Sequence, residues 1–226
     1  MTSYGIHKYA FGTPMPRHRH AEPYMAIVVE GGYLEAGDAG RIEAGPGDVI
    51  LHGAFESHQD HFEARGATVL NLPLGSDDNA TAGRISDVDD IVRLAQRDPW
   101  AASARVRFEM SSDKPTLADW PDLLAAELRR DPSLVISDWA DRMGLAAASV
   151  SRGFARAYGV TPKRFRLEAR ALRAVRVLRH GNGSLAELSA ELGFADQAHM
   201  SRAIAATTGL SPLRLRAKLV QERRGR

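Results

Sequence analysis

The spacing of hydrophobic residues changes along the chain and divides it into two parts. Between residues 24 and 74, short apolar runs alternate with Gly and Pro, as in "YMAIVV", "GRIEAGPGDVIL" and "ATVLNLPL". Short, closely spaced strands of this kind are typical of a small β-barrel or sandwich. Gly31-Gly32 lies between two apolar runs and predicts a hairpin turn. Residues 75–87 are polar and rich in turn formers, and predict a loop.

From Val88 onward the period becomes helical. Residues 88–97 place Val88, Ile91, Val92 and Ala95 on one face. Further helices are expected over residues 99–110 and 116–130, the second ending near Arg130 because a proline follows. We therefore predict an α+β chain of two domains: a barrel with flanking helices over 1–84, a helical linker region over 85–130, and an all-α domain over 131–226.

The C-terminal part contains an internal repeat. Residues 136–166, "ISDWADRMGLAAASVSRGFARAYGVTPKRFR", align with residues 185–216, "LAELSAELGFADQAHMSRAIAATTGLSPLRLR". The first glycine of each copy is offset by 49 residues and the later arginine, Arg152 or Arg202, by 50, so the second turn is one residue longer. Each copy predicts a helix that ends at a glycine and a second helix after a short turn, which is a helix-turn-helix.

An arginine stands on the outer face of the second helix in each copy. At the helical period, Arg152 and Arg202 lie opposite the apolar stripes and are surrounded by alanines. Short neighbours let a helix enter a major groove closely, and a guanidinium group can bind guanine through two hydrogen bonds. One such arginine alone is more simply a solvated surface residue. Its recurrence in both copies favours a role in reading bases.

Charge is divided unevenly along the chain. Residues up to Leu124 carry 11 Lys and Arg against 19 Asp and Glu, a balance of −8, whereas the rest carry 19 against 9, a balance of +10. The basic half predicts a polyanionic partner, the alternative being a merely solvated basic surface.

Composition also excludes several classes of protein. The chain has no cysteine, which excludes disulfides and thiolate metal sites. Neither a signal peptide nor an apolar run of about 20 residues is visible, so we expect a cytoplasmic protein with no membrane partner.

Residues 131 to about 218 resemble the DNA-binding domain of AraC-type transcription regulators. The resemblance rests on "LGFADQAHMSR", "TGLSPLRLR" and "SRGFARAYGVTPKRFR". It implies two helix-turn-helix units joined by a long helix, with double-stranded DNA as partner and Arg152 and Arg202 as base-contacting residues. RNA polymerase and a second copy of the chain are further candidate partners.

The remaining candidates for DNA contact lie around these two arginines and on the connecting helix. They are Ser149, Ser151, Arg156, Gln197, His199, Ser201, Arg166 and Arg170, the last two as candidates for phosphate contacts. The second copy departs from the family, which usually has a large aromatic residue where Met200 and Ile204 stand and a basic residue at Ala205. The first copy is therefore expected to be the stronger reader.

Six of the eight histidines fall within the first 61 residues. On a strand, "RHRHAE" would direct His18, His20 and Glu22 to one side. Imidazoles and a carboxylate suit a divalent metal such as Zn, Fe, Mn or Ni, and His58 could approach from a neighbouring strand. Two alternatives stay open: an organic effector held by these groups and Tyr24 without a metal, or no pocket at all.

Residues 10 to 74 resemble a cupin barrel. Gly12, His18 and His20 meet the first cupin motif, but its glutamate ligand is absent, because Tyr24 or Met25 stands there. The preferred hypothesis is a DNA-binding transcription regulator, not an enzyme, whose barrel senses a small molecule or a metal. The alternative is a metal-dependent cupin enzyme carrying an accessory basic domain.

Overall fold

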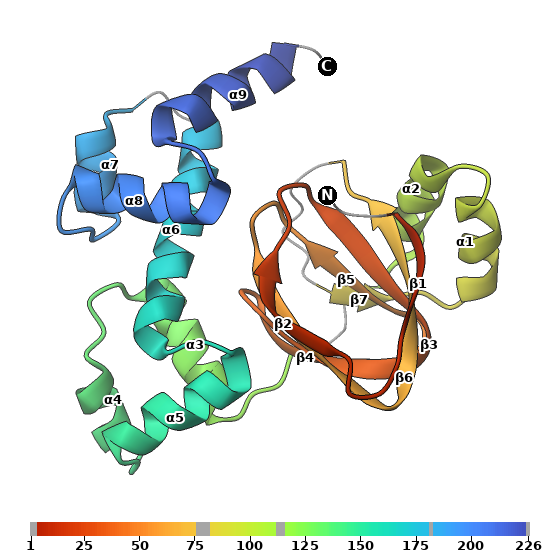
Figure 1. Cartoon of the computed structure of the whole chain (residues 1–226), viewed down its shortest axis with the longest axis horizontal. Helices are drawn as coiled ribbons and strands as arrows, with labels where there is room; N and C mark the ends of the chain where they lie inside the picture. The colour runs from red at the N-terminus through yellow and green to blue at the C-terminus, as the bar shows by residue number, and fades with distance from the viewer. Residues whose placement is uncertain (1–3, 76–81, 112–115, 181–182, 225–226) are drawn as a thin grey trace. The chain divides into compact units, whose positions relative to one another are not determined.

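The structure, a computed structural model, describes residues 4–75, 82–111, 116–180 and 183–224. It divides the chain into two compact units, residues 1–122 and 123–226 (Figure 1). The first is rich in β-sheet and the second is helical, which confirms the predicted α+β organisation in two domains.

One antiparallel sheet forms most of the N-terminal unit. Its strands follow the order β1-β6-β3-β5-β7, with β2 also paired to β6 and β4 to β3. Among the described residues no strand pair closes this sheet into a barrel, so the cupin barrel stays a prediction. The strands are β1 (Gly5–Tyr9), β2 (Pro14–Arg19), β3 (Tyr24–Gly37), β4 (Gly40–Ala44), β5 (Asp48–His52), β6 (Ser57–Pro73) and β7 (Ala82–Arg84).

The two longest strands, β3 and β6, bend together at Gly31. The β3–β6 register shifts on both sides of this residue, as at a β-bulge. Gly31 has a φ of 71°, and a Cβ added there would lie 2.0 Å from the carbonyl oxygen of Gly66. The hairpin predicted at Gly31-Gly32 is therefore wrong: β3 continues through the bend, because β6 pairs with it before and after.

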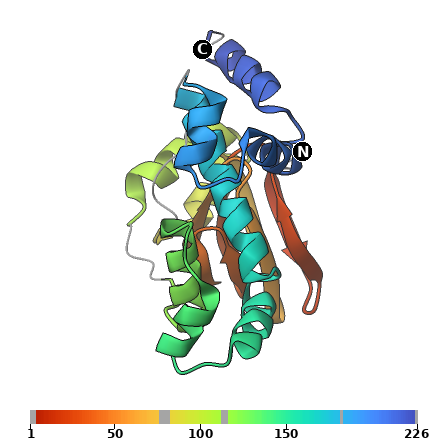
Figure 2. The ribbon, with the colours of Figure 1, turned by 90° about the vertical axis from the view of Figure 1, so that its left-hand side faces the viewer.

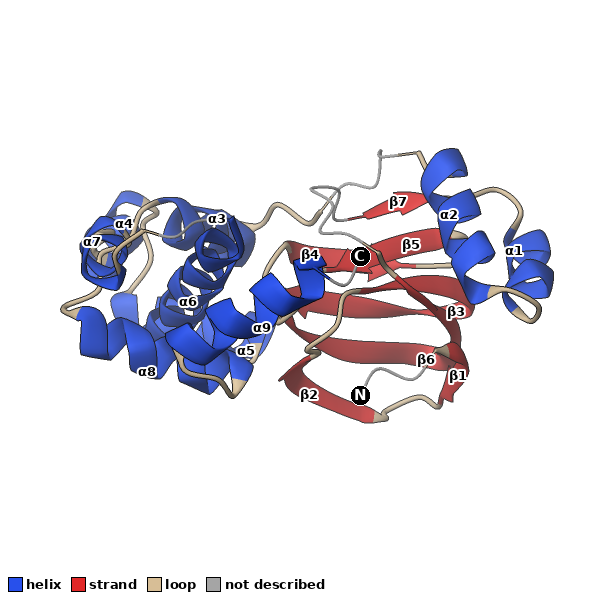
Figure 3. Cartoon of the chain, turned by 90° about the horizontal axis from the view of Figure 1, so that it is seen from above, coloured by secondary structure: helices blue, strands red, loops and turns tan. Residues whose placement is uncertain are grey.

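The sheet buries both of its faces. One face packs on helices α1 (Val88–Ala95) and α2 (Pro99–Glu109), which lie beside the strands in Figure 3. The opposite face, here called the inner face, buries a second apolar cluster that includes Tyr33, Ile42 and Phe62. The helix predicted over residues 88–97 is confirmed. The loop predicted over 75–87 is wrong at β7, where Ala82 is buried, and residues 76–81 lie outside the described part.

The C-terminal unit is built around the long helix α6. Figure 2 shows α6 in teal running lengthwise between the green first corner and the blue second corner. As predicted, α3 ends at Arg130 and α6 begins with a proline, whose missing N–H costs nothing at that position. The helices are α3 (Trp120–Arg130), α4 (Ile136–Arg142), α5 (Ala147–Tyr158), α6 (Pro162–His180), α7 (Leu185–Glu191), α8 (Gln197–Thr208) and α9 (Pro212–Arg224).

The two corners, α4–α5 and α7–α8, turn by the same backbone device. Gly144 and Gly193 have φ of 66° and 70°, conformations that favour glycine. In each corner the N–H after the glycine donates to a carbonyl five residues back at 2.9 Å, which is a Schellman motif. The turns span residues 143–146 and 192–196, so the extra residue predicted in the second turn is confirmed.

The cores beneath the two corners differ in chemistry. In the first corner, Phe154 stacks on Tyr158 at 4.7 Å between ring centroids, and both rings pack edge-on against Phe165. In the second, Met200 and Ile204 are fully buried, Ile204 and Leu215 stand in place of Phe154 and Phe165, and the buried ring is that of Phe194 in the turn. The same backbone frame therefore holds an aromatic core in one copy and a mainly aliphatic core in the other.

The bend at Gly31 predicts a stability difference between two glycine substitutions. Gly31→Ala should destabilise the N-terminal unit by more than about 2 kcal/mol, since it combines a left-handed φ with a backbone clash. Gly12→Ala, at the same φ but with open space around its Cβ, should cost only about 1–2 kcal/mol. Urea denaturation followed by circular dichroism measures both, and equal losses would contradict the proposed clash.

Candidate nucleic-acid interface and histidine cluster

Helices α5 and α8, here called the reading helices, present equivalent arginines. Arg152 and Arg202 are each the sixth residue of their helix and are exposed. Neither makes a hydrogen bond or ion pair within the described part of the chain. Val150 and Met200, two residues earlier, are completely buried. Both guanidinium groups therefore point away from the core and are available to a partner.

Small residues surround both arginines. Ala148 and Ala198 precede them by one helical turn and are exposed, as is Ala205 after Arg202. Arg156 is also exposed on α5 and adds a second cation to that helix. Within the described residues α8 carries no corresponding charge, since Ala206 stands at the equivalent position.

The serine and glutamine candidates divide between the two helices. Ser149 and Ser151 are exposed beside Arg152, and Gln197 is exposed at the start of α8. Ser201 is half-buried, and its hydroxyl donates to the Gln197 carbonyl oxygen at 2.8 Å. The first helix therefore offers two accessible hydroxyl groups, whereas the hydroxyl on the second is bound to its own helix.

His199 helps to hold the start of α8. Its Nδ1 accepts a hydrogen bond from the Ala195 N–H at 3.4 Å, and its ring lies edge-on to Phe194 at 5.4 Å. Its backbone N–H donates to the capping Asp196 carboxylate at 2.6 Å. His199 is thus placed by the fold near the reading face, and these contacts leave its Nε2 as the atom for any partner.

Arg166 and Arg170 on α6 make hydrogen bonds to backbone carbonyl oxygens within the C-terminal unit. Arg166 donates to the carbonyl oxygens of Pro132 at 3.2 Å and Leu134 at 2.8 Å. Arg170 donates to the carbonyl oxygens of Gly193, at 2.7 Å, and of Pro132. These bonds tie α6 to the segment before α4 and to the second turn. Both side chains bind the unit's own backbone, and their predicted phosphate contacts stay a prediction.

A histidine cluster lies at one end of the inner face of the sheet. His18 on β2 is the register partner of His58 on β6, and His20 follows β2 directly. One ring nitrogen from each of these three residues lies within 4.8 Å of the others. Tyr24 joins them, with its hydroxyl 3.3 Å from Nε2 of His58. The structure therefore brings together four of the residues named from the sequence, and their role as an effector or metal site stays a prediction.

Glu22 is not part of this cluster. Strand β2 ends at Arg19, and Glu22 stands exposed on a bend before β3. The alternation that would have placed it beside His20 therefore does not continue so far. The structure leaves the cluster without the carboxylate that was expected from the sequence.

Two other residues, His52 and Glu35, complete the cluster and were missed from the sequence. The His52 ring stacks on Tyr24 at 4.4 Å and lies 4.4 Å from the ring of His58. Glu35 is buried, with Oε2 3.5 Å from Nε2 of His52. Alternation along the strands was the available signal, because Glu35 and His52 share the inner face with Tyr33 and Ile50.

Burial disfavours the charged forms of several of these groups. It lowers the pKa of His20 to about 4 and that of His52 to about 3, and it also lowers the pKa of His58. Burial, with a contribution from the nearby Asp60, raises the pKa of Glu35 well above its usual value. Burial therefore disfavours the charged forms of both Glu35 and His52, which weakens any ion pair between them.

The three histidines fit the requirements of a metal. Nδ1 of His18 lies 2.9 Å from the Pro16 carbonyl oxygen, which only accepts, so Nδ1 carries the hydrogen and Nε2 keeps its lone pair. Nδ1 of His58 is buried with no hydrogen-bond partner among the described residues. Neutral imidazoles are the form that binds zinc and similar ions.

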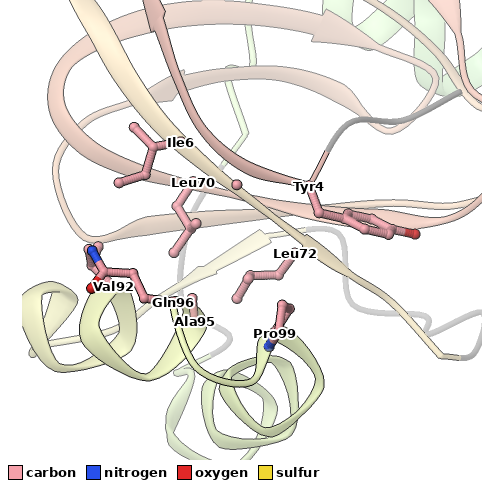
Figure 4. A pocket seen from close by; sticks show the side chains of 9 residues that line it. Tyr4, Ile6, Leu70, Leu72, Val92, Ala95, Gln96 and Pro99 are labelled. Carbon is pink, nitrogen blue, oxygen red and sulfur yellow. The ribbon is translucent and has the colours of Figure 1, made fainter.

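A separate pocket opens between the sheet and its covering helices (Figure 4). Its volume is about 340 Å³, and its walls are mostly apolar. None of the predicted effector residues lines it. The lining comes from the chain before and within β1, from β6, and from α1 and the start of α2: Tyr4, Gly5, Ile6, Leu70, Leu72, Val92, Ala95, Gln96 and Pro99.

The fold of the C-terminal unit and its two exposed arginine faces define a helix-turn-helix domain with two corners. Residues 139–218 match the family model described as a helix-turn-helix domain. The match covers less than half of the chain, and the matched part is a helix-turn-helix domain of the AraC type, which confirms the resemblance predicted from its motifs. A comparison with the curated proteins finds no match.

Several solved structures are similar to the chain. The C-terminal domain of AraT, a response regulator from Geobacillus stearothermophilus, has 17% identity and a TM-score of 0.42, covering 46% of this chain and 88% of that one. ToxT from Vibrio cholerae has 10% identity and a TM-score of 0.42, covering 96% and 97%. An AraC-type regulator from Chromobacterium violaceum has 25% identity and a TM-score of 0.38, covering 44% and 87%.

Across the described ranges, no helix combines the length and the apolar character that crossing a membrane requires.

The hydrogen bonds of Arg166 predict a structural role for it. Arg166→Ala should destabilise the C-terminal unit by about 1–3 kcal/mol, because two backbone carbonyl oxygens lose a charged donor. Arg173→Ala, on the exposed side of the same helix, should cost less than about 0.5 kcal/mol. Thermal denaturation followed by circular dichroism distinguishes the two variants, and an unchanged melting temperature for Arg166→Ala would contradict this role.

Proposed function

We propose that the chain is a sequence-specific DNA-binding transcription regulator whose N-terminal unit senses an effector at the histidine cluster. The observation that carries the proposal is the repeated corner, which exposes an unpaired arginine at the same position of both reading helices. The basic charge of this half supplies the general attraction to DNA.

The two reading helices stand toward the two ends of α6, as Figure 1 shows. An α-helix fits the major groove of B-DNA, and helices one helical turn apart, about 34 Å, enter successive grooves on one face of the duplex. Arg152 and Arg202 would then each bind a guanine edge. Arg156, Ser149, Ser151 and Gln197 are positioned to assist.

For the effector we propose a divalent transition metal bound by His18, His20 and His58. The supporting observations are the closeness of the three ring nitrogens and the unpartnered Nδ1 of His58, a buried polar atom that a ligand would satisfy. When bound, the ion would supply a positive charge and fixed coordination. The chain's own contribution is to hold the residues that follow β2 against β6.

Regulation requires that the effector prefer one state of the protein. A ligand at the cluster alters DNA binding only through different affinities for the states that bind DNA well and poorly. This is binding rather than turnover, and conversion of a substrate by the purified chain would instead favour the cupin-enzyme alternative. RNA polymerase, a second copy of the chain and a cytoplasmic location follow from the resemblance and stay part of the proposal.

The DNA-reading assignment predicts the effect of removing each arginine. Arg152→Ala and Arg202→Ala should each weaken specific binding about 5- to 150-fold, since one bidentate contact to guanine discriminates by about 1–3 kcal/mol. Mobility-shift titration at fixed salt, with specific and scrambled duplexes, measures the change.

Lys8→Ala is a matched control for this experiment. It removes one positive charge from an exposed position on β1 in the other unit. This variant should bind the specific duplex as the wild-type chain does. If both arginine variants also kept wild-type affinity and specificity, the assigned reading positions would be wrong.

The metal assignment predicts that His58 is required for metal binding. The wild-type chain should bind one zinc ion, and His58→Ala should weaken binding by more than about tenfold, because a buried ligand is lost. Isothermal titration with zinc and elemental analysis of dialysed protein measure affinity and stoichiometry.

His61→Ala serves as the control, because His61 is exposed on the same strand and is not one of the clustered histidines. It should bind zinc as the wild-type chain does. Failure of the wild-type chain to bind zinc, nickel, manganese or iron would overturn the metal proposal and leave the cluster as a candidate site for an organic effector.

A further inference from the structure

The reading helices carry the same order of short and long side chains on their outer faces. At an offset of 50 residues, Ala148, Arg152 and Ala155 of α5 correspond to Ala198, Arg202 and Ala205 of α8. Within each helix these positions are spaced by four and three residues, so they share one face. The two helices thus share a face on which one arginine stands between two alanines.

The backbone presents these two surfaces in the same way. Each helix begins after a Schellman turn and ends at a glycine in the left-handed conformation, Gly159 with φ of 72° and Gly209 with φ of 73°. Each has twelve residues, with its arginine at the sixth. The matching side chains therefore stand at the same position along each helix.

The reading helices of the two corners also run in the same direction across α6. In Figure 1, α5 and α8 each run from the side of the preceding short helix, α4 or α7, across α6. The corners are therefore related more nearly by a shift along α6 than by a two-fold rotation. Proteins with two-fold symmetry read inverted repeats, whereas surfaces related by a shift meet the same strand in the same order.

The chemistry of the shared surface limits which bases it prefers. A guanidinium group binds O6 and N7 of guanine, and the methyl group of an alanine contacts the C5 methyl of thymine. A single arginine between two alanines therefore favours a guanine with thymine nearby. On the described face of α8 the only charged group is Arg202. Methyl contacts therefore contribute a larger share of the base preference of α8 than of α5.

Three outward positions break the correspondence: Ala147, Ser149 and Arg156 of α5 stand where α8 has Gln197, His199 and Ala206, and only the last exchange removes an arginine. Arg156 on α5 is exposed, whereas its counterpart on α8 is Ala206. An additional arginine can specify one further base pair, and an alanine at that position cannot bind a base edge by hydrogen bonds. The half-site beneath α5 should therefore be longer by one specified base pair than the half-site beneath α8.

From these features we propose that one chain reads an imperfect direct repeat in DNA. Each half-site contains a guanine bound by Arg152 or Arg202 and a neighbouring thymine whose methyl group touches an alanine. The α5 half-site has one further specified base pair, read by Arg156. This inference rests on the proposed DNA-binding function and adds the kind of operator that the chain selects.

Selection of binding sites from random duplex DNA by the full chain tests the proposal directly. The expected sites contain two related guanine-thymine half-sites in the same orientation, about one helical turn apart. Specific sites with inverted or unrelated half-sites would overturn the direct repeat while leaving the DNA-binding function intact. Failure to enrich any site would overturn the proposed function, and this inference with it.

Replacing thymine by deoxyuridine tests the methyl contacts without changing the protein. Deoxyuridine at the thymine of the α8 half-site should weaken binding about fourfold, the equivalent of one buried methyl group. Ala205→Gly or Ala198→Gly, whichever residue touches that methyl, should bind both duplexes equally, with circular dichroism confirming the fold. Equal wild-type affinity for the two duplexes would overturn the thymine assignment.

An exchange at the position of Arg156 and Ala206 tests the additional base pair. Arg156→Ala should remove the base preference at the outermost position of the α5 half-site, and Ala206→Arg should create a guanine preference of about fivefold or more in the α8 half-site. Arg173→Ala, off the reading helices, is the control and should leave both selected half-sites unchanged. Selected sites that are the same for wild type and both exchange variants would overturn the assignment to Arg156.

Discussion

The N-terminal unit depends on one place where two backbones touch, Gly31 against Gly66. No side chain fits between them, because a Cβ on Gly31 would overlap the Gly66 carbonyl group. This approach lets β3 and β6 stay paired through a sharp bend. The bend in turn allows His52 on β5 to meet His58 on β6, although these two strands are not paired. A site made of distant histidines thus follows from two residues that lack side chains.

The histidine cluster is a largely buried polar site in which burial disfavours the charged forms of His20, His52 and His58. Polar atoms taken from water destabilise a fold unless they find hydrogen-bond partners. Here Tyr24 provides one partner, but Nδ1 of His58 has none within the described residues. Such an atom is costly in a purely structural core and useful in a binding site. The low pKa values that burial gives His20 and His52 keep their lone pairs available in moderately acidic solution.

In the C-terminal unit, the two copies of the corner share their backbone geometry more closely than their core side chains. Both corners use the same glycine turn and place an arginine at the same helical position, while an aromatic core in one copy is replaced by a mainly aliphatic core in the other. Geometry set by backbone hydrogen bonds tolerates such exchange, because a core needs volume and apolarity more than particular side chains. Arg166 and Arg170 then fix the frame by binding carbonyl oxygens of neighbouring segments.

Local patterns in the sequence were sufficient to predict the helices, the end of α3 at Arg130 and the longer second turn. They were also sufficient to predict the outward direction of Arg152 and Arg202. Each depends on residues within a few positions of one another, where helical periodicity, proline and glycine act directly. The approach of His18, His20 and His58 also followed from alternation along strands and a family motif. The roles of Gly31, β7, His52, Glu35, Arg166 and Arg170 were decided only in the tertiary structure. Each depends on which distant segment lies alongside, and strand pairing or a carbonyl partner more than 20 residues away leaves no local mark.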